Sequence, residues 1–344
     1  CFDHKEFLES GDQDVHKIPR QVVNLVSMVV VAIMLILIGD RVDEFRVYQG
    51  ATIAAYALAI LSIVMLTGFS GQVSLGHGGL LAVGGYAAAL VMQNLQWPLW
   101  ASFFAAVIAA AIVGALLGVA AARLSGPYLA GTTLAFAVGI PSIANQFTQL
   151  GGEQGLPYDI GLPPARFGEE FTQYKWLFWI CAAVLLVAIT VASNIGRSKF
   201  GRTWRAVRAD ESGAALAGIN IARSKVLAFT VSAGFAGIAG ALYSATVSLV
   251  APGSFSLGLS FLILTGAVIG GIRSIAGAVV GGFVLIVVPV ISESISSGAS
   301  ESIAVNLPGV ITGLLLVLTV LLSPGGTAAT VSHLWHSLGR GSRK

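Results

Sequence analysis

Runs of about twenty apolar residues recur from one end of this 344-residue chain to the other, with few charged residues between them. A hydrocarbon core of about 30 Å is crossed by about 20 helical residues, and a helix satisfies its own backbone hydrogen bonds there. Only 10% of the residues are charged and 56% are hydrophobic. The chain is therefore predicted to be an all-α polytopic membrane protein that lies in the lipid bilayer.

About ten candidate spans can be marked, with boundaries uncertain by several residues. Two of them are weak, since one contains Pro141 and Asn145 and another is short, so eight spans plus two re-entrant segments remain possible. The ten spans lie at about residues 21–39, 51–67, 79–95, 99–122, 132–148, 175–195, 225–247, 258–272, 276–292 and 307–322.

Basic residues gather in one stretch, Gly196 to Lys225, which holds seven of the nineteen lysines and arginines. Positive loops are retained on the cytoplasmic side of a membrane. With the N-terminus inside, fifteen of the nineteen fall on the cytoplasmic side, and the reverse orientation would place them outside. We expect a cytoplasmic arm at 1–20, a transmembrane domain at 21–322 with the cytoplasmic loop 196–225, and a cytoplasmic tail at 323–344.

Within that loop, the segment from Gly201 to Gly218 has the spacing of a short amphipathic helix. Trp204, Val207, Ala214 and Ala215 recur at helical intervals beside a basic stripe. A helix lying on lipid would explain the tryptophan and the arginines, but not the small-residue run GAALAG that follows. We therefore favour docking of another protein. The candidate contacts are Arg202, Arg205, Arg208, Asp210 and Glu211.

The order of the spans suggests an internal duplication. Spans two to five and seven to ten would form two sets of four that enter the membrane in opposite directions, each with a glycine-dense segment. Inverted repeats with interrupted helices are typical of transporters. Glycines four apart, such as Gly114 and Gly118, are predicted to let helices approach closely.

Polar residues cluster between Thr67 and Tyr86, where Ser70, Gln72, Ser74 and His77 alternate with glycines. Broken backbone at membrane depth is tolerated where it is buried in protein or lines a cavity. One interpretation is a re-entrant or broken helix beside a substrate pathway, with these four residues as its lining. The other is a short loop that caps the next helix, with His77 as a hydrogen-bonded structural residue.

The sequence lacks several motifs that are typical of nucleotide hydrolysis, ion-coupled transport and enzyme catalysis. There is no G-x-x-x-x-G-K-[ST] phosphate loop, no charged residue in the middle of a span, and no nucleophile–base set. Cys1 and Cys181 have no metal-ligand or disulfide spacing. We therefore expect no enzyme activity, no metal or cofactor in this chain, and no nucleic-acid binding, because no segment could form a basic soluble domain.

Four motifs resemble the LivM family, the permease subunits of bacterial ABC importers for branched-chain amino acids. They are TGFSGQVSLGHGGLLAVGGYAAAL, GRTWRAVRADESGAALAGINIARSKVLAF, SAGFAGIAGALYSATVSLVAPGSFSL and VIGGIRSIAGAVVGG, which occur in the expected order.

The resemblance implies an ABC importer permease fold in the bacterial inner membrane. It also implies a heterodimer with a LivH-like permease, two cytoplasmic ATPase subunits that bind ATP and Mg, and an extracytoplasmic substrate-binding protein. The implied substrate is leucine, isoleucine or valine. Alternatives are urea, short amides or aromatic acids, or a stand-alone channel or secondary carrier.

The same resemblance assigns Gly201–Gly218 to the coupling helix that rests on the ATPase. Related sequences usually have two alanines and then a glutamate after the acidic pair, whereas Gly213 and Ala215 replace one alanine and the glutamate here. Glycine costs about 1 kcal/mol of helix propensity relative to alanine. We therefore expect the helix to end or kink near Gly213.

Overall fold

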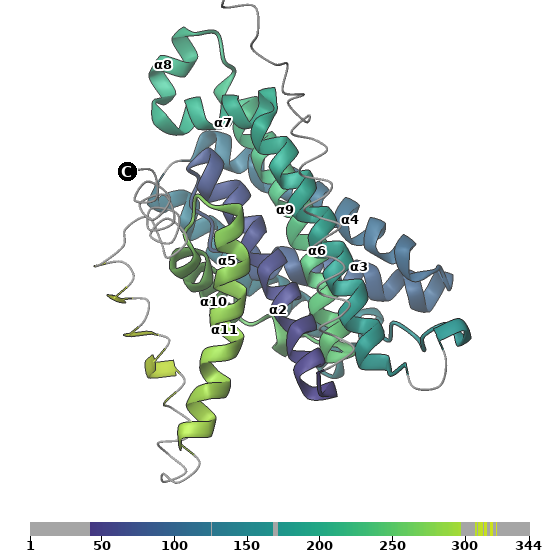
Figure 1. Cartoon of the computed structure of the whole chain (residues 1–344). Coiled ribbons are helices and arrows are strands. Elements are labelled where there is room, and N and C mark those ends of the chain that lie inside the picture. The colour runs from purple at the N-terminus through teal and green to yellow at the C-terminus, as the bar shows by residue number, and fades with distance from the viewer. Residues whose placement is uncertain are drawn as a thin grey trace, which may run out of the picture. The chain divides into compact units, whose positions relative to one another are not determined.

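The computed structural model describes residues 42–124, 126–167 and 171–296, together with residues 307, 309–311, 313–314, 317–318 and 321 (Figure 1). The predicted arm at 1–20, the span at 21–39, most of the span at 307–322 and the tail at 323–344 lie outside the described residues. The number of spans expected from the sequence is therefore tested only in part.

Seven helices in the described ranges are long and apolar enough to cross a membrane. This confirms the prediction of an all-α polytopic membrane protein. An eighth apolar helix, α10 (Leu257–Gly270), has 14 residues and a length of about 21 Å, which is short for a bilayer. The seven are α2 with its continuation η1 (Glu44–Ile63 and Val64–Ser70), α3 (His77–Leu95), α4 (Leu99–Arg123), α5 (Pro127–Gln146), α6 (Gln173–Arg197), α9 (Ile221–Val247) and α11 (Ile275–Ser296).

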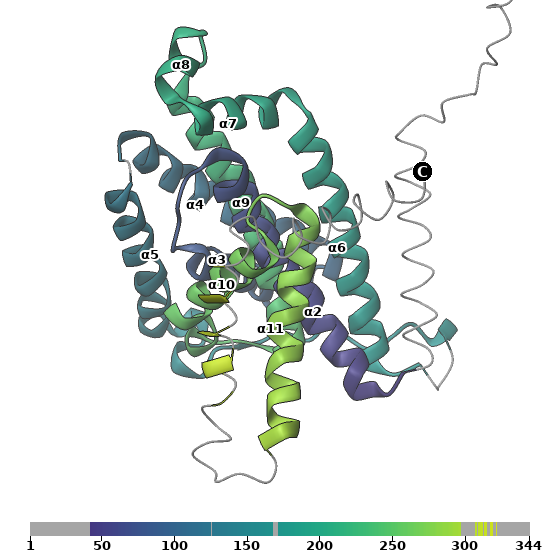
Figure 2. The ribbon, with the colours of Figure 1, turned by 60° about the vertical axis from the view of Figure 1, so that its left-hand side comes forward.

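Two short helices, α7 (Lys199–Ala209) and α8 (Glu211–Leu216), occupy the basic loop between α6 and α9. Figure 2 shows α7 crossing the ends of the long helices and α8 projecting beyond it. We call this side of the bundle the α7 face and the other side the opposite face.

On the opposite face, the loop after α5 meets the loop after α9. The short strands β1 (Leu156–Pro157) and β2 (Leu249–Val250) pair antiparallel, with Leu156 facing Val250. Four single turns of 3-10 helix complete these loops: η2 (Thr148–Leu150), η3 (Gly152–Gln154), η4 (Ala165–Phe167) and η5 (Pro252–Phe255).

The helices that begin with α2 and those that begin with α9 form two sets, and the main contacts between the sets have counterparts in which the sets trade places. Helix α4 packs along α9, and α11 packs along α2; α3 contacts both α4 and α9, and α10 contacts both α11 and α2. The two leading helices, Glu44–Ser70 and Ile221–Val247, have 27 residues each. Both are followed by a left-handed residue, Gly71 with φ 76° and Ser248 with φ 58°. This pattern agrees with the two inverted sets expected from the sequence.

Glycines allow the helices at the centre to approach backbone to backbone. A Cβ added to Gly240 of α9 would overlap the carbonyl oxygen of Leu81 in α3, and one added to Gly84 of α3 would overlap Gly237 of α9. Gly114 and Gly118 of α4 lie equally close to α9. Because lipid provides no hydrophobic drive for helix association, such close contacts supply much of the packing energy.

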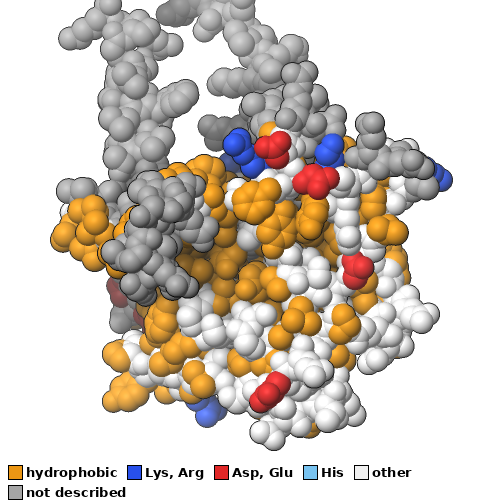
Figure 3. Space-filling view, turned by 90° about the horizontal axis from the view of Figure 1, so that it is seen from below, with side chains coloured by type: hydrophobic (Ala, Val, Ile, Leu, Met, Phe, Trp, Pro, Cys, Tyr) orange, Lys and Arg blue, Asp and Glu red, His pale blue; other side chains and the backbone are white. Residues whose placement is uncertain are grey.

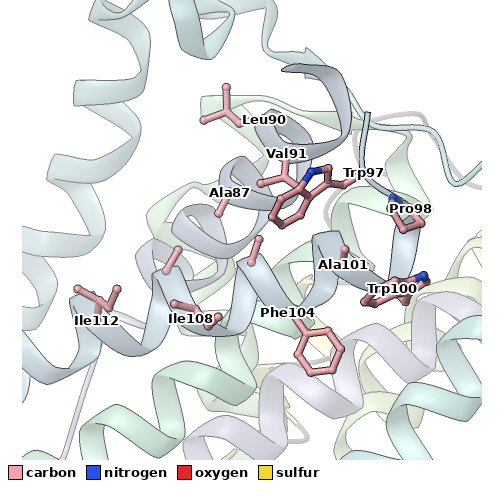
Figure 4. A pocket seen from close by; sticks show the side chains of 12 residues that line it. Ala87, Leu90, Val91, Trp97, Pro98, Trp100, Ala101, Phe104, Ile108 and Ile112 are labelled. Carbon is pink, nitrogen blue, oxygen red and sulfur yellow. The ribbon is translucent and has the colours of Figure 1, made fainter. Parts of the chain in front are cut away.

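An apolar groove of about 820 Å³ runs between α3 and α4 (Figure 4). Trp97 and Trp100 lie at one end with 51% and 65% of their surface exposed. Its lining consists of aliphatic and aromatic side chains, including Leu90, Phe104 and Ile112. Such a surface suits contact with lipid chains and offers no polar recognition.

We expect Gly240→Ala to destabilise the protein, because the added methyl group would force α9 away from α3. Overpacking of this kind costs about 1–3 kcal/mol. The matched control is Gly131→Ala in α5, where no atom lies within 4 Å of the added Cβ. Thermal melting of the detergent-purified protein should show a lower midpoint for Gly240→Ala alone, and equal midpoints for the two variants would contradict this packing.

Candidate functional site

The chain breaks between α2 and α3, where the sequence predicts an interruption. Helix α2 changes to the π-helix η1 at Val64 and ends at Ser70. Gly71 is left-handed, residues 71–76 are not helical, and α3 starts at His77. A short π-helix inside a longer helix is frequent at functional sites, because it leaves carbonyl groups without their usual partners.

Ser70 and Gln72 lie together at the α7 face, at the end of η1. Ser70 Oγ donates to the carbonyl oxygen of Leu66 over 2.7 Å, and Gln72 Nε2 donates to Ser70 Oγ over 2.9 Å. Thr67 Oγ1 donates to the carbonyl oxygen of Gln72 over 2.9 Å. Gln72 Oε1 is buried and has no partner among the described residues. One acceptor of this pair therefore remains available.

Ser74 and His77 lie deeper and are fully buried. Ser74 Oγ accepts a hydrogen bond from the amide of Gly76 over 3.2 Å. His77 Nε2 lies 3.0 Å from Ser232 Oγ of α9, and this hydroxyl donates to the carbonyl oxygen of Ser62 in α2 over 2.8 Å. Since the single hydroxyl proton is committed to Ser62, we assign the ring proton to Nε2 of His77. This geometry favours the structural interpretation of His77.

Side chains from two other helices bond to the backbone around the break, and one from a third helix bonds to His77. The amide of Leu75 donates to Thr133 Oγ1 of α5, and the amide of Gly78 donates to Ser260 Oγ of α10, each over 3.0 Å. With Ser232 of α9, these contacts connect the break to α5, α9 and α10. The four predicted pathway residues thus form two pairs, one at the α7 face and one inside the bundle.

The basic loop contains two helices, and the expected end near Gly213 is wrong by three residues. Asp210 interrupts the helix with φ −159° and ψ 111°, and its Oδ1 accepts from the amide of Ser212 over 2.9 Å as the N-cap of α8. Gly213 lies inside α8, where a Cβ would lie 2.6 Å from Asp210 Oδ2. The glycine therefore makes room for the capping carboxylate.

The apolar side of α7 faces the membrane helices. Trp204 and Val207 are buried, as is Ala214 in α8, whereas Ala215 is exposed. Helix α7 contacts η1 and α9 as well as α6. The predicted apolar stripe thus anchors the loop to its own chain.

The three arginines predicted as one stripe have different environments. Arg202 and Arg205 are exposed, and each donates over 3.0 Å to a carbonyl at the end of α6, that of Arg197 and that of Gly196. The guanidinium carbon of Arg205 also lies 5.9 Å from the ring centre of Phe69. Arg208 turns inward and donates to the carbonyl oxygen of Gly68 in η1.

The aliphatic stem of Arg208 covers Gly71, where a Cβ would lie 2.7 Å from Arg208 Cγ. Burial, and then the nearby charge of Arg273, lower the pKa of Arg208, although an arginine side chain in a protein remains protonated. Glu211 forms an ion pair with Lys225: its two carboxylate oxygens lie 2.8 and 3.0 Å from Nζ of Lys225.

A cavity of about 340 Å³ brings the two predicted groups together. Ser70 and Gln72 line it from the break, Arg208, Asp210 and Glu211 line it from the loop, and Ile272 lines it from the turn after α10. The sequence predicts these groups separately, and the structure places them on one cavity at the α7 face.

One exposed residue was not among the predicted contacts. Leu216, the last residue of α8, has 91% of its surface exposed. It is the one large apolar residue of the run GAALAG, and this pattern could have indicated from the sequence that it is a contact residue. A single exposed leucine is ordinary on a protein surface, so it is the position of Leu216 at the end of a projecting helix that makes it a candidate contact.

A sequence profile of the family described as "Branched-chain amino acid transport system / permease component" matches residues 48–320. The chain belongs to this permease family. The family expected from the four motifs is confirmed, and the polytopic helical fold agrees with it.

Curated relatives carry corresponding names. The "High-affinity branched-chain amino acid transport system permease protein LivM" of Escherichia coli (strain K12) is 32% identical over 257 residues, 67% of this chain and 60% of LivM. LivH of the same strain is 28% identical over 302 residues, 82% of this chain and 94% of LivH. BraD of Pseudomonas aeruginosa is 27% identical over 309 residues, again 82% and 94%. The chain thus spans 60% of the length of LivM. No solved structure matches.

We expect Arg208→Ala to loosen the end of η1, because the Gly68 carbonyl would lose its charged donor. Hydrogen exchange of a peptide covering Val64–Gln72 should accelerate roughly three- to tenfold, as expected for a half-exposed charged hydrogen bond. Arg202→Ala is the control, since Arg202 binds the end of α6 instead. Equal exchange in the two variants would show that Arg208 does not stabilise η1.

Proposed function

We propose that the chain is a transmembrane permease subunit of an ATP-driven ABC importer in the bacterial inner membrane. It would move branched-chain amino acids, or a related small solute such as urea, a short amide or an aromatic acid, toward the cytoplasm. Membership of the permease family and the names of the relatives support this class of protein.

The observation that carries the proposal is the projecting α7–α8 loop with Leu216 exposed at its end. The sequence has no phosphate loop, so the energy must come from another subunit. A short helix that ends in an exposed leucine and small residues fits a cleft on such a subunit. We infer that α8 docks on the ATPase and that ATP and Mg are bound there, with no catalysis in this chain.

The loop would transmit movement as one body. Trp204 and Val207 fix α7 to the membrane helices, and Arg208 joins it to the Gly68 carbonyl in η1. A shift of α7 would therefore pull on the end of η1, where π-helical backbone changes conformation at low cost. Arg202 and Arg205, exposed on α7, are the basic candidates for contact with the ATPase. Asp210 and Glu211 remain candidates that also have partners within the chain.

The pathway residues would then divide between two roles. Ser70 and Gln72 lie at the cavity beside Arg208 and would meet solute at the cytoplasmic end. Ser74 and His77 would hold the break in position through Gly76 and Ser232. The substrate preference would come largely from an extracytoplasmic binding protein, as the family resemblance implies.

The assembly would contain a second permease, LivH-like, together with two ATPase subunits and the binding protein. In this arrangement both termini and the loop 196–225 are cytoplasmic, and the opposite face of the bundle is extracytoplasmic. Arg273 supports the grouping of basic residues, because it lies near Arg208 on the α7 face.

We expect Leu216→Asp to release the ATPase, because a carboxylate would replace the apolar contact at the centre of the interface. An unpaired carboxylate buried at such a contact should weaken binding roughly tenfold or more. Leu162→Asp is the matched control, since Leu162 is 81% exposed in the loop on the opposite face. The measurement is recovery of the ATPase with the affinity-purified permease from native membranes, and full recovery with Leu216→Asp would exclude docking through α8.

A further inference from the structure

A second cavity, of about 470 Å³ and with both polar and apolar lining residues, lies at the opposite face, far from the α7–α8 loop. It is formed where the last turns of α5 meet η3, η5 and the first turn of α10. Figure 3 views this face, on which a few acidic and basic side chains lie among apolar and uncharged ones. The lining consists of Ala137, Val138, Pro141, Ser142, Asn145, Glu153, Pro252, Gly253, Ser256 and Leu257.

Helix α5 presents hydrogen-bond acceptors to this cavity. Pro141 lies inside α5 and has no N–H, so the carbonyl of Ala137 lacks its usual helical donor. Ser142 Oγ donates its proton to the carbonyl oxygen of Val138 over 2.9 Å, which leaves the hydroxyl only lone pairs to offer. Pro141 therefore leaves a carbonyl acceptor of α5 available to a ligand in the cavity.

Glu153 adds a negative charge to the same lining. It lies in η3, is exposed, and has no hydrogen bond or ion pair within the described part of the chain. No lysine or arginine is among the lining residues. Carboxylate and carbonyl acceptors without a cation nearby favour a ligand that brings its own positive charge and N–H donors.

Apart from Asn145 and Ser256, the rest of the lining is apolar, with Val138, Pro252 and Leu257 as its larger members. The volume lies in the usual range for small-molecule sites. A compact ammonium compound with an aliphatic part matches this combination. The first turn of α10, at the positive end of a helix dipole, also borders the cavity, so a carboxylate on the same ligand would not meet negative charge on every side.

We propose that this cavity receives the ammonium group of the transported amino acid at the opposite face, with Glu153 and the Ala137 carbonyl as its acceptors. The assignment of an amino acid rests on the proposed function; the preference for an ammonium group rests on the cavity. Helix α10 links this cavity to the one beside Arg208, because Leu257 at its start lines the first and Ile272 just past its end lines the second.

The test uses the complete importer with its native partners and the substitution Asn145→Cys in the cavity. Accessible thiol is titrated at low salt with the cationic reagent MTSET and the anionic reagent MTSES. The importer without the substitution gives the background, and the reaction with a free small thiol gives the intrinsic ratio of rates. We expect the ratio of the MTSET rate to the MTSES rate to be about tenfold higher at this position than with the free thiol. One nearby negative charge raises the local concentration of the cationic reagent about threefold and lowers that of the anionic reagent about threefold.

Adding Glu153→Gln should remove this preference, whereas the control Glu44→Gln, an exposed carboxylate at the start of α2, should leave it. The proposal would be overturned if MTSET did not react faster relative to MTSES than with the free thiol. It would also be overturned if this preference for MTSET persisted in the Glu153→Gln variant. Recovery of the ATPase subunits confirms assembly of each variant.

Protection from MTSET by added ligands then tests separately whether the cavity binds an ammonium group and whether the ligand is an amino acid. Leucine should slow the reaction, and 4-methylpentanoate, which lacks the amine, should not. Protection by butylamine but not by leucine would support the ammonium site and contradict amino-acid transport. Equal protection by 4-methylpentanoate, or no protection by any amine, would overturn the site itself.

Discussion

Inside a bilayer, a helix can be interrupted only where other groups replace the hydrogen bonds that its backbone loses. The break between η1 and α3 depends on this constraint. Thr67, Ser74, Thr133 and Ser260 each bond to backbone within or beside residues 71–76. Because Thr133 and Ser260 belong to α5 and α10, the break also fixes the positions of these helices. A movement of the break is therefore a movement of the helices that border both cavities.

The two cavities lie at the two ends of α10, which is only about 21 Å long. At one end lie Glu153 and the Ala137 carbonyl, which Pro141 leaves without a helical donor; at the other, Arg208 joins the projecting loop to η1. In the exchanged packing of the two helix sets, α3 packs against α9 and α10 packs against α2, so each contacts the leading helix of the other set. In the proposed function, a force applied to α8 would reach the opposite face through these packed helices, without a charged residue in mid-membrane.

The sequence predicts the membrane class, the break near residues 67–86 and the amphipathic helix in the basic loop, because each depends on local composition. It does not predict the orientation of Arg208, since its partner Gly68 is 140 residues away and only the fold brings them together. The expected helix end near Gly213 was wrong because the N-cap at Asp210 determines the boundary more strongly than glycine propensity does. Pro141 makes the span at 132–148 look doubtful, yet α5 extends through it, since transmembrane helices tolerate an interior proline.

The central claim is that this chain transports only when another subunit supplies energy through the α7–α8 loop. The direct measurement is uptake of radiolabelled leucine into liposomes that contain either the purified chain alone or the complete importer. Uptake should require the complete importer, its binding protein and ATP on the side of the α7 face. Uptake by the chain alone, without ATP, would contradict the claim and identify a stand-alone channel or carrier.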